Sequence, residues 1–488
     1  MTMKRTLQQK GDILVSVIIF AAIAVTITVA LVNWGATLLK SVRLVADKEQ
    51  ALQIAEAGID YYRWHLAHSP IDYKDGTCAT VCSNGPYTHQ FTDKDGNVIG
   101  SYELTITPPL NGSTLVTIVS KGTVVSNPQI SRSIKVTMGM ASWAQYAVVA
   151  NDNMNFGSGT IIYGPVHSNY GIHFEGISYG PMTSALTQYT DPDVNSLKYA
   201  IYTSTTTLPD PVPPTAIDLT RHSFGGTGTT MFYAGRKLAV PSVDFTALNN
   251  ALANLKTAAI SSSSYFASTT GYGYHFVLHT NDTFDVYKVT ALVAEPDGCS
   301  NASGQSRWGT WSIQSETLLN SGVSIPTSGV IYAESDVWVD GTVNGTRLTI
   351  GAGILPDPGS TSWPNITVNS DLLYTNFDGT DSIGLIAQGN VNVGLKSSDT
   401  LNIDAALIAQ NGRVGRYYYS SSCGTGYHPT TLNLFGIIAT NKRYGFAYAN
   451  NTGYINRNIR YDSNLLYGPP PVFPSTSSTY ITLSWQEI

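Results

Sequence analysis

The feature that most constrains this chain is an uncharged run near its start. Residues 13–39, ILVSVIIFAAIAVTITVALVNWGATLL, contain no charged side chain over 27 positions. A helix needs about 20 apolar residues to cross a bilayer, whereas a cleaved secretion signal has an apolar core of roughly 7–15 residues and a small-x-small exit. The run is too long for such a signal and lacks that exit. It therefore predicts a membrane-spanning helix.

Basic side chains before this run indicate its orientation. Lys4, Arg5 and Lys10 precede it, and an excess of Lys and Arg is typical of the cytoplasmic side of a membrane segment. On the far side, Lys40 and Arg43 are soon followed by acidic residues. We therefore expect a single-pass protein with its N-terminus in the cytoplasm and most of the chain extracytoplasmic or on the cell surface.

An apolar stripe continues the helical pattern beyond the membrane segment. No proline occurs before Pro70, so a transmembrane and amphipathic helix is expected over residues 12–66. From Ile13 to Leu66 such a helix would be roughly 80 Å long at 1.5 Å per residue. Without further information, a plain membrane anchor with a juxtamembrane helix remains an alternative. The expected packing face contains every seventh residue: Leu38, Val45, Leu52, Ile59 and Leu66.

Two segments resemble a type IV prepilin. A short basic leader ends at Lys10-Gly11, and the segment DKEQALQIAEAGIDYYRWHL (47–66) is similar to the start of PilX-type minor pilins. The resemblance implies that residues 1–11 are a leader peptide, that a prepilin peptidase cleaves after Gly11, and that Asp12 is the mature N-terminus. It also implies a bacterial pilus subunit whose partners are membrane lipid, other pilin subunits and the inner-membrane assembly platform.

Two residues depart from the usual pilin pattern. Asp12 stands where Phe or Met is usual, and Ser16 stands where the fifth mature residue is usually Glu. In pilins that Glu pairs with the N-terminal amine of a neighbour, since an unpaired charge in lipid is costly. Its absence favours a subunit at the tip or start of a fibre, with no pilin stacked above it, or a pseudo-pilin that does not polymerise.

The composition favours a β-rich protein outside the cytoplasm. Charged residues make up only 12% of the chain, which contains 44 Gly and 29 Tyr. The net charge of −6 is spread along the chain, and no basic stripe indicates nucleic acid. The cysteines are compatible with two disulfides of unknown connectivity, and the first two either close their own loop or are unrelated thiols. They are Cys78, Cys82, Cys299 and Cys423.

Periodicity divides the rest of the chain. Residues 67–140 alternate apolar β-branched and polar side chains and predict a small antiparallel β domain, which in pilin-like proteins covers the exposed half of the helix. Residues 141–180 and 326–488 contain degenerate ten-residue repeats such as GLIAQGNVNV and ALIAQNGRVG, in which an apolar run, an Ala and a polar corner recur. This pattern is typical of β-solenoid coils, with a β-sandwich as the alternative. Residues 181–325 are expected to form an α+β insertion, with a stiff Pro-rich linker at 205–215.

The predicted fold is therefore mainly β with a long N-terminal α-helix. A pilin-like helix and a small antiparallel sheet come first. The degenerate β-solenoid follows, and the α+β insertion packs against it as a lateral cap.

Motifs for catalysis, cofactors or metals are absent from the sequence. No P-loop, GxSxG, HExxH or CxxC occurs, so we expect no enzyme activity, no cofactor and no metal; His167 and His173 lack a third ligand. The rival hypothesis is a membrane-anchored solenoid enzyme or binding protein acting on extracellular polysaccharide. Its acids would be Glu334, Asp336 and Asp340, since alternate residues of a strand lie about 6.5–7 Å apart, within the range of glycosidase carboxyl pairs. A solvated outer face of a coil explains the same residues.

Aromatic-rich segments near the C-terminus indicate a recognition surface, because Tyr combines a broad, stiff contact area with a hydroxyl group. These side chains either contact a ligand such as a surface glycan or pack at solenoid corners. The sequence as a whole predicts a minor-pilin-like surface subunit that displays a large β-rich region for adhesion or assembly. The candidate ligand surface contains Tyr417, Tyr418, Tyr419, Tyr444 and Tyr448.

Overall fold

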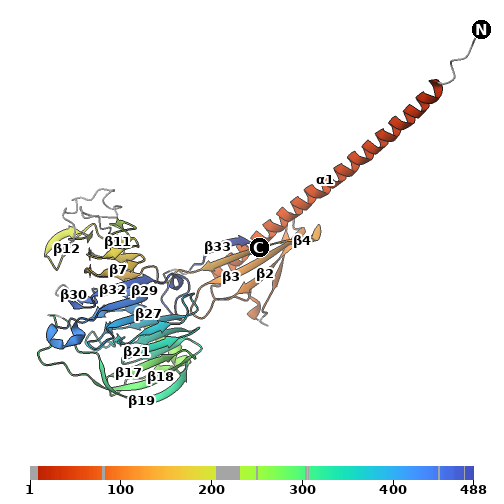
Figure 1. The fold of residues 1–488 in the computed structure, drawn as a ribbon. Helices are drawn as coiled ribbons and strands as arrows, with labels where there is room; N and C mark the ends of the chain where they lie inside the picture. Colours follow the sequence, from red (N-terminus) through yellow and green to blue (C-terminus); the bar gives the residue numbers. More distant parts are fainter. Residues whose placement is uncertain are drawn as a thin grey trace, which may run out of the picture. The chain divides into compact units, whose positions relative to one another are not determined.

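A computed structural model of the chain has one long N-terminal helix and an otherwise largely β architecture (Figure 1), which confirms the predicted fold class. The predicted leader up to residue 8, Cys82 and the predicted linker 205–215 lie outside the residues that it describes. Those described residues are 9–79, 83–204, 231–248, 251–302, 305, 307–448, 451–476 and 479–488. The chain divides into two compact units. Unit 1 contains Met1–Pro108, Val116–Met138 and Thr479–Ile488, and unit 2 contains Pro109–Leu115 and Gly139–Ser478.

Unit 1 consists of helix α1 and a five-stranded sheet in the order β1-β2-β3-β4-β33, in which β1 to β4 are antiparallel. The assignment of all of residues 326–488 to the solenoid was wrong at its end, because β33 joins the edge of this sheet and its Glu487 pairs with Arg132 of β4. The elements are α1 (Gln9–His68), η1 (Thr77–Ala79), β1 (Tyr87–Thr92), β2 (Val98–Thr107), β3 (Val116–Val124), β4 (Asn127–Gly139) and β33 (Ile481–Glu487).

The second half of α1 packs closely on β2 and β3. A Cβ atom on Gly122 of β3 would lie 2.1 Å from the carbonyl oxygen of Ala51 and 2.6 Å from the amide nitrogen of Ala55. Only a residue without a side chain allows the two backbones to approach so closely. The buried side chains of the helix are Ala51, Ile54, Ala55, Ile59, Tyr62 and Leu66.

The predicted packing stripe is only partly the buried face. Ile59 and Leu66 are buried and Leu52 is half-buried, but Leu38 and Val45 are 53% and 64% exposed. A strict seven-residue repeat also drifts by about 20° per heptad around a straight helix. Leu38 and Val45 precede Ala51, the first buried residue of α1, so they lie before the part of the helix that the sheet covers.

Unit 2 is a β-solenoid. Its strands pair in parallel between successive coils, and such parallel ladders distinguish a solenoid from the antiparallel β-sandwich. Three ladders run along it. The first contains β16 (Tyr265–Phe266), β20 (Val330–Ala333), β22 (Arg347–Ala352), β25 (Ser382–Ala387), the second halves of β27 (Thr400–Ala409) and β29 (Thr431–Thr440), β5 (Val148–Ala150), β8 (Val166–Ser168), β11 (Met182–Ser184) and β15 (Arg236–Lys237).

The other two ladders form the remaining sides of the coils. The second contains the end of β21 (Asp336–Val343), β24 (Leu372–Tyr374), the first halves of β27 and β29, β32 (Asn456–Tyr461), β7 (Thr160–Tyr163) and β10 (Ile177–Ser178). The third contains the start of β21, β23 (Ile366–Thr367), β26 (Val391–Val393) and β28 (Val414–Arg416), and separately β6 (Met154–Phe156), β9 (Ile172–Phe174) and β14 (Ile201–Tyr202).

The order of the coils in space differs from their order in the sequence. Strands β5 and β7, which come early in the chain, stack on β29 and β32 from its C-terminal part. The predicted insertion 181–325 is also divided, since β11, β15, β16 and β17 pair with solenoid strands. The chain therefore first forms the coils at one end of the solenoid. It then crosses to the other end and adds further coils until β29 and β32 stack on the first ones.

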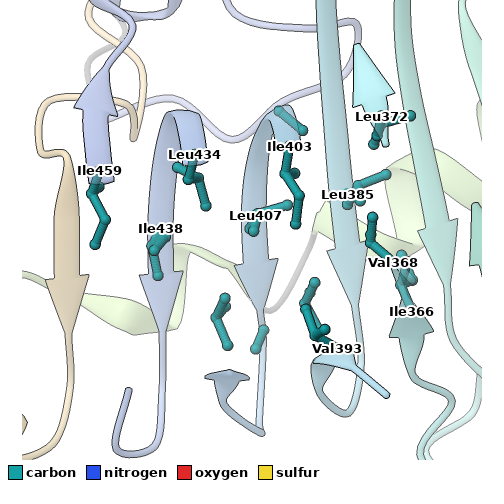
Figure 2. Packing of buried hydrophobic residues seen from close by; sticks show 14 of the residues in the cluster. Ile366, Val368, Leu372, Leu385, Val393, Ile403, Leu407, Leu434, Ile438 and Ile459 are labelled. Carbon is teal, nitrogen blue, oxygen red and sulfur yellow. The ribbon is translucent and has the colours of Figure 1, made fainter. Parts of the chain in front are cut away.

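The core consists of inward-facing aliphatic columns, part of which Figure 2 shows. One column continues in register through seven coils: Ile350, Leu385, Leu407, Ile438, Val148, Val166 and Met182. The Ala of the sequence repeat forms a second column, in which Ala333, Ala352, Ala387 and Ala409 are in register. Each of these Ala residues is the last residue of its strand.

A three-stranded antiparallel segment and one helix complete the solenoid. The segment contains β17 (Gly273–His279), β18 (Thr283–Leu292) and β19 (Ile313–Ser324), and β17 pairs in parallel with β21. Helix α3 (Ala251–Ser261) contacts β20 and β22. The remaining short elements are β12 (Gln188–Asp191), β13 (Ser196–Tyr199), β30 (Ala447–Tyr448), β31 (Thr452–Gly453), η2 (Phe245–Leu248), η3 (Ser421–Cys423), η4 (Thr425–Tyr427) and η5 (Ser463–Leu466).

Candidate functional surfaces

The first half of α1 is an apolar surface exposed on every side. By length and composition α1 could cross a membrane, with a mean hydropathy of 2.8 in its most apolar window. Hydroxyl groups in this part donate to carbonyl oxygens one turn earlier: Thr26 to Ala22, and Thr28 to Ala24. This satisfies polar groups internally, as a lipid environment requires. The large apolar side chains exposed here are Ile13, Leu14, Val15, Val17, Ile18, Ile19, Phe20, Ile23, Val25, Ile27, Val29, Leu31, Val32, Trp34, Leu38, Leu39, Val42, Leu44 and Val45.

The predicted leader junction lies at the start of this surface. The backbone of Gly11 and Asp12 is helical, and Ser16 lies one turn further along on the same helix. The structure thus places the predicted cleavage position at the end of α1 that carries the apolar surface.

The structure joins two of the four cysteines across unit 2. Cys299 and Cys423, 124 residues apart, form a disulfide. Around it pack Trp311, Trp338 and Tyr419, so the crosslink anchors an aromatic cluster at the side of the coils. Cys78 is also disulfide-bonded, and its predicted partner Cys82 lies outside the described residues.

The three carboxylates of the enzyme hypothesis each have a separate charged partner. Glu334 lies 2.5 Å from the ammonium group of Lys256, and the carboxylate of Asp336 lies 2.9 Å from the guanidinium of Arg307. Asp340 accepts a hydrogen bond from His275 at 3.1 Å. 

Burial and pairing act in opposite directions on these acids. Burial would raise the pKa of Glu334, but hydrogen bonds from Lys256 and Tyr265 outweigh it and lower the pKa. Burial raises the pKa of Asp336, and the charge of Arg307 only partly opposes this effect. Glu334, Asp336 and Asp340 are therefore members of three ion pairs within the wall of the solenoid.

The predicted tyrosine surface was wrong, because three of its five members are buried. Tyr417, Tyr419 and Tyr444 are 2%, 0% and 4% exposed. The hydroxyl of Tyr419 donates to the carbonyl of Gly309 at 2.8 Å, and that of Tyr448 donates to the carbonyl of Arg416 at 2.8 Å. Tyr418 and Tyr448 are half-buried and pack edge to face on each other.

The two histidines considered as metal ligands have other partners. His167 is hydrogen-bonded to Thr183 at 2.9 Å and to Asn169 at 3.0 Å, and His173 contacts the carboxylate of Glu175 at 2.7 Å. Among the residues that the structure describes, no group of three His, Cys, Asp or Glu side chains is placed to hold a metal ion.

A different tyrosine surface is present on the second ladder, and the sequence analysis missed it. Tyr163, Tyr179 and Tyr233 lie on consecutive coils and are 45%, 42% and 44% exposed. A signal was present in the sequence: the octapeptides IIYGPVHS (161–168) and ISYGPMTS (177–184) repeat at a spacing of 16 residues. Each places a Tyr at the same position of a coil.

Comparisons with known proteins give a structural resemblance and no sequence match. No protein-family model matches the chain, and no curated protein matches it. Among solved structures, the chain is similar to the crystal structure of the competence-associated pilin ComZ from Thermus thermophilus, with a TM-score of 0.32 and 14% sequence identity over 91% of this chain and 97% of that chain. A TM-score this low does not establish a shared fold, so the function proposed below rests on the residues of this chain.

Proposed function

We propose that the chain is a minor-pilin-like, membrane-inserted subunit of a type IV pilus or related fibre, and that it displays its solenoid at the cell surface for adhesion or assembly. The observation that carries the proposal is the division of α1 into two parts. The first part exposes apolar side chains on all sides, and the second buries a stripe against an antiparallel sheet. An all-round apolar helix is stable in lipid or among other apolar helices, and a pilin subunit uses both environments in turn.

The start of the chain supports the same proposal. The basic residues before Gly11 favour a cytoplasmic N-terminus, and the similarity of residues 47–66 to PilX-type minor pilins favours a minor rather than a major subunit. The partners would be membrane lipid, other pilin subunits, the inner-membrane assembly platform and a prepilin peptidase. Ser16, in place of the usual Glu, favours a place at the tip or start of the fibre.

The ion pairs of unit 2 support a role in display rather than catalysis. Glu334, Asp336 and Asp340 each have a structural partner, whereas a glycosidase needs two carboxyl groups that face one sugar. The alternative enzyme would release sugar from an extracellular polysaccharide, and Asp336→Asn would abolish that release. Activity of this kind in the purified protein would contradict the non-enzymatic proposal.

Leader processing tests the proposal most directly. The intact mass of the protein would be measured from cells with and without a prepilin peptidase. We expect a mature protein that begins at Asp12 only when the peptidase is present, and an unprocessed Gly11→Leu variant in both strains. An intact leader in both strains for the wild-type protein would refute the proposal.

The location of the mature protein separates a fibre subunit from a plain anchor. Immunoblots would compare sheared surface fractions with total membranes for the wild type and for Ser16→Glu. In a fibre subunit the new Glu can pair with a neighbour's amine, so assembly should persist. In a plain anchor the same carboxyl costs about 1–3 kcal/mol near the membrane surface and lowers the inserted amount. Wild-type protein that is found only in membranes would exclude a tip subunit.

A further inference from the structure

The outer surface of the second ladder carries a row of exposed tyrosines whose rings stack on one another. The ring centroids of Tyr163 and Tyr179 lie 4.8 Å apart at an interplanar angle of 8°, and those of Tyr179 and Tyr233 lie 4.6 Å apart at 25°. These distances match the spacing of about 4.7–4.9 Å between neighbouring strands. The three rings therefore stack face to face along the direction in which the coils stack.

This stacking determines what the row presents to solvent. Since both faces of Tyr179 and one face each of Tyr163 and Tyr233 are covered by a neighbouring ring, the row presents mainly ring edges and hydroxyl groups. The edge of an aromatic ring carries partial positive charge, and the phenol hydroxyl is a hydrogen-bond donor. The row is therefore a donor-rich, weakly electropositive strip rather than a set of open faces for sugar stacking.

An arginine extends this strip by one coil. Arg460 of β32 is in register with Tyr163 of β7, and its side chain is exposed. Within the described part of the chain, Arg460 forms no ion pair or hydrogen bond through its side chain. An unpaired guanidinium in a protein of net charge −6 offers a planar, bidentate site for a carboxylate.

A row of asparagines continues from β32 in the opposite direction, onto β29 and β27, at the register position two residues before Arg460. Asn458 donates to Asn433 at 2.8 Å, and Asn433 donates to Asn402 at 2.9 Å. Each amide nitrogen has a second hydrogen that this row does not use. The Asn row therefore adds further donors along the same direction, at one side chain per coil.

We propose that this strip, made of Arg460, Tyr163, Tyr179, Tyr233, Asn433 and Asn458, binds an extended acidic polysaccharide that contains uronic acid residues. The donors repeat at the spacing of the coils, which suits a linear polymer lying along the solenoid. The single guanidinium binds a carboxylate, and the hydroxyl and amide groups bind sugar hydroxyls. Duplex DNA is disfavoured because its binding depends on many Lys and Arg contacts to phosphates. The inference rests on the proposed function, since it needs the solenoid to be displayed outside the cell.

The binding of two uronate polymers by the full-length protein in detergent tests this inference. Biolayer interferometry would compare polygalacturonate and alginate with neutral dextran and with sheared duplex DNA. We expect binding of at least one uronate polymer that weakens with salt, and none of dextran. Arg460→Gln should raise the Kd about tenfold, since it removes a charge-assisted pair. Tyr179→Phe keeps the stacked ring and should raise the Kd about threefold.

Matched controls are exposed residues of the same types elsewhere. Lys442→Gln removes an exposed cation, and Tyr272→Phe removes a hydroxyl from a tyrosine that is 52% exposed; both should bind like the wild type. Equal binding of dextran, tighter binding of DNA, no binding of either uronate polymer, or variants that behave like the controls would each overturn the inference. If the protein is processed at Gly11 and recovered in sheared fibres but binds no uronate, the inference alone fails. Unprocessed protein that binds uronate would refute the proposed function instead.

Discussion

A buried histidine links the antiparallel segment of unit 2 to the first parallel coil. His275 of β17 is 8% exposed. Its Nδ1 lies 2.9 Å from the carboxylate of Glu316 on β19, and its Nε2 lies 3.1 Å from that of Asp340 on β21. The imidazole therefore joins two carboxylates from strands on opposite sides of β17. We expect its protonation to control the stability of this end of the solenoid.

The expected size follows from the pKa. Burial alone would lower the pKa of His275, but the hydrogen bonds with Asp340 and Glu316 outweigh it and raise the pKa from 6.5 to about 9. A group whose pKa is raised in the folded state contributes its full stability below pH 6.5 and loses it as the pH rises to 9. A pKa difference of one corresponds to 1.36 kcal/mol, so the increase from 6.5 to about 9 corresponds to about 3 kcal/mol of unfolding free energy.

The assay is denaturant unfolding of the full-length protein in detergent at pH 6 and at pH 9.5. Between pH 6 and pH 9.5 the unfolding free energy of the wild type should fall by about 2–3 kcal/mol more than that of His275→Gln. Gln can donate a hydrogen bond but does not titrate. Tyr287→Phe is the control: its ring centroid lies 5.8 Å from that of His275, and the change removes neither carboxylate. Equal pH dependence in the wild type and His275→Gln would refute the reasoning.

Three further substitutions test other parts of the fold by the same unfolding measurement. Arg347→Met removes donors to the carbonyls of Asn111, Gly379, Gly468 and Pro469 and should cost about 3–5 kcal/mol; a loss below about 1 kcal/mol would contradict this. Replacing Cys299 and Cys423 by Ser opens a crosslink over 124 residues and should cost about 4–5 kcal/mol in the chain-entropy model, so a reductant should destabilise the wild type by more than this variant, which keeps the disulfide of Cys78. Gly122→Ala places a Cβ atom 2.1 Å from the Ala51 carbonyl oxygen and should destabilise unit 1 by about 1–3 kcal/mol; unchanged stability would show that α1 can move away without cost.

The sequence was most informative where one physical requirement dominated. The uncharged run of 13–39 and the absence of proline before Pro70 predicted one long helix, and α1 continues without a break from Gln9 to His68. The packing face was harder to predict. The buried residues Ala51, Ala55, Tyr62 and Leu66 follow the 3.6-residue period of a straight helix, whereas the predicted stripe followed the seven-residue period of a supercoil.

The aromatic residues show why the candidate surface could not be chosen correctly from composition. Tyr419 and Tyr179 occur in similar Gly- and Ser-containing segments, yet the first is 0% exposed and the second 42% exposed. Tyr419 follows β28 and is covered by the aromatic cluster around the Cys299–Cys423 disulfide, a contact between segments far apart in the sequence. Composition contains no information on such contacts. The 16-residue spacing of Tyr163 and Tyr179 does indicate that they share one position on consecutive coils.

The stacking order of the coils lies beyond what degenerate repeats can encode in a single sequence. Each repeat predicts a coil with an apolar inner side, and any coil with matching columns can be its neighbour. In this chain Val148 of an early coil lies in register with Ile438 of a late one, and Ile162 with Ile459. A coil cannot bury its apolar side alone. The early coils therefore lack one neighbour until β29 and β32 are in place, and the last part of the chain is required to complete a core that its first coils begin.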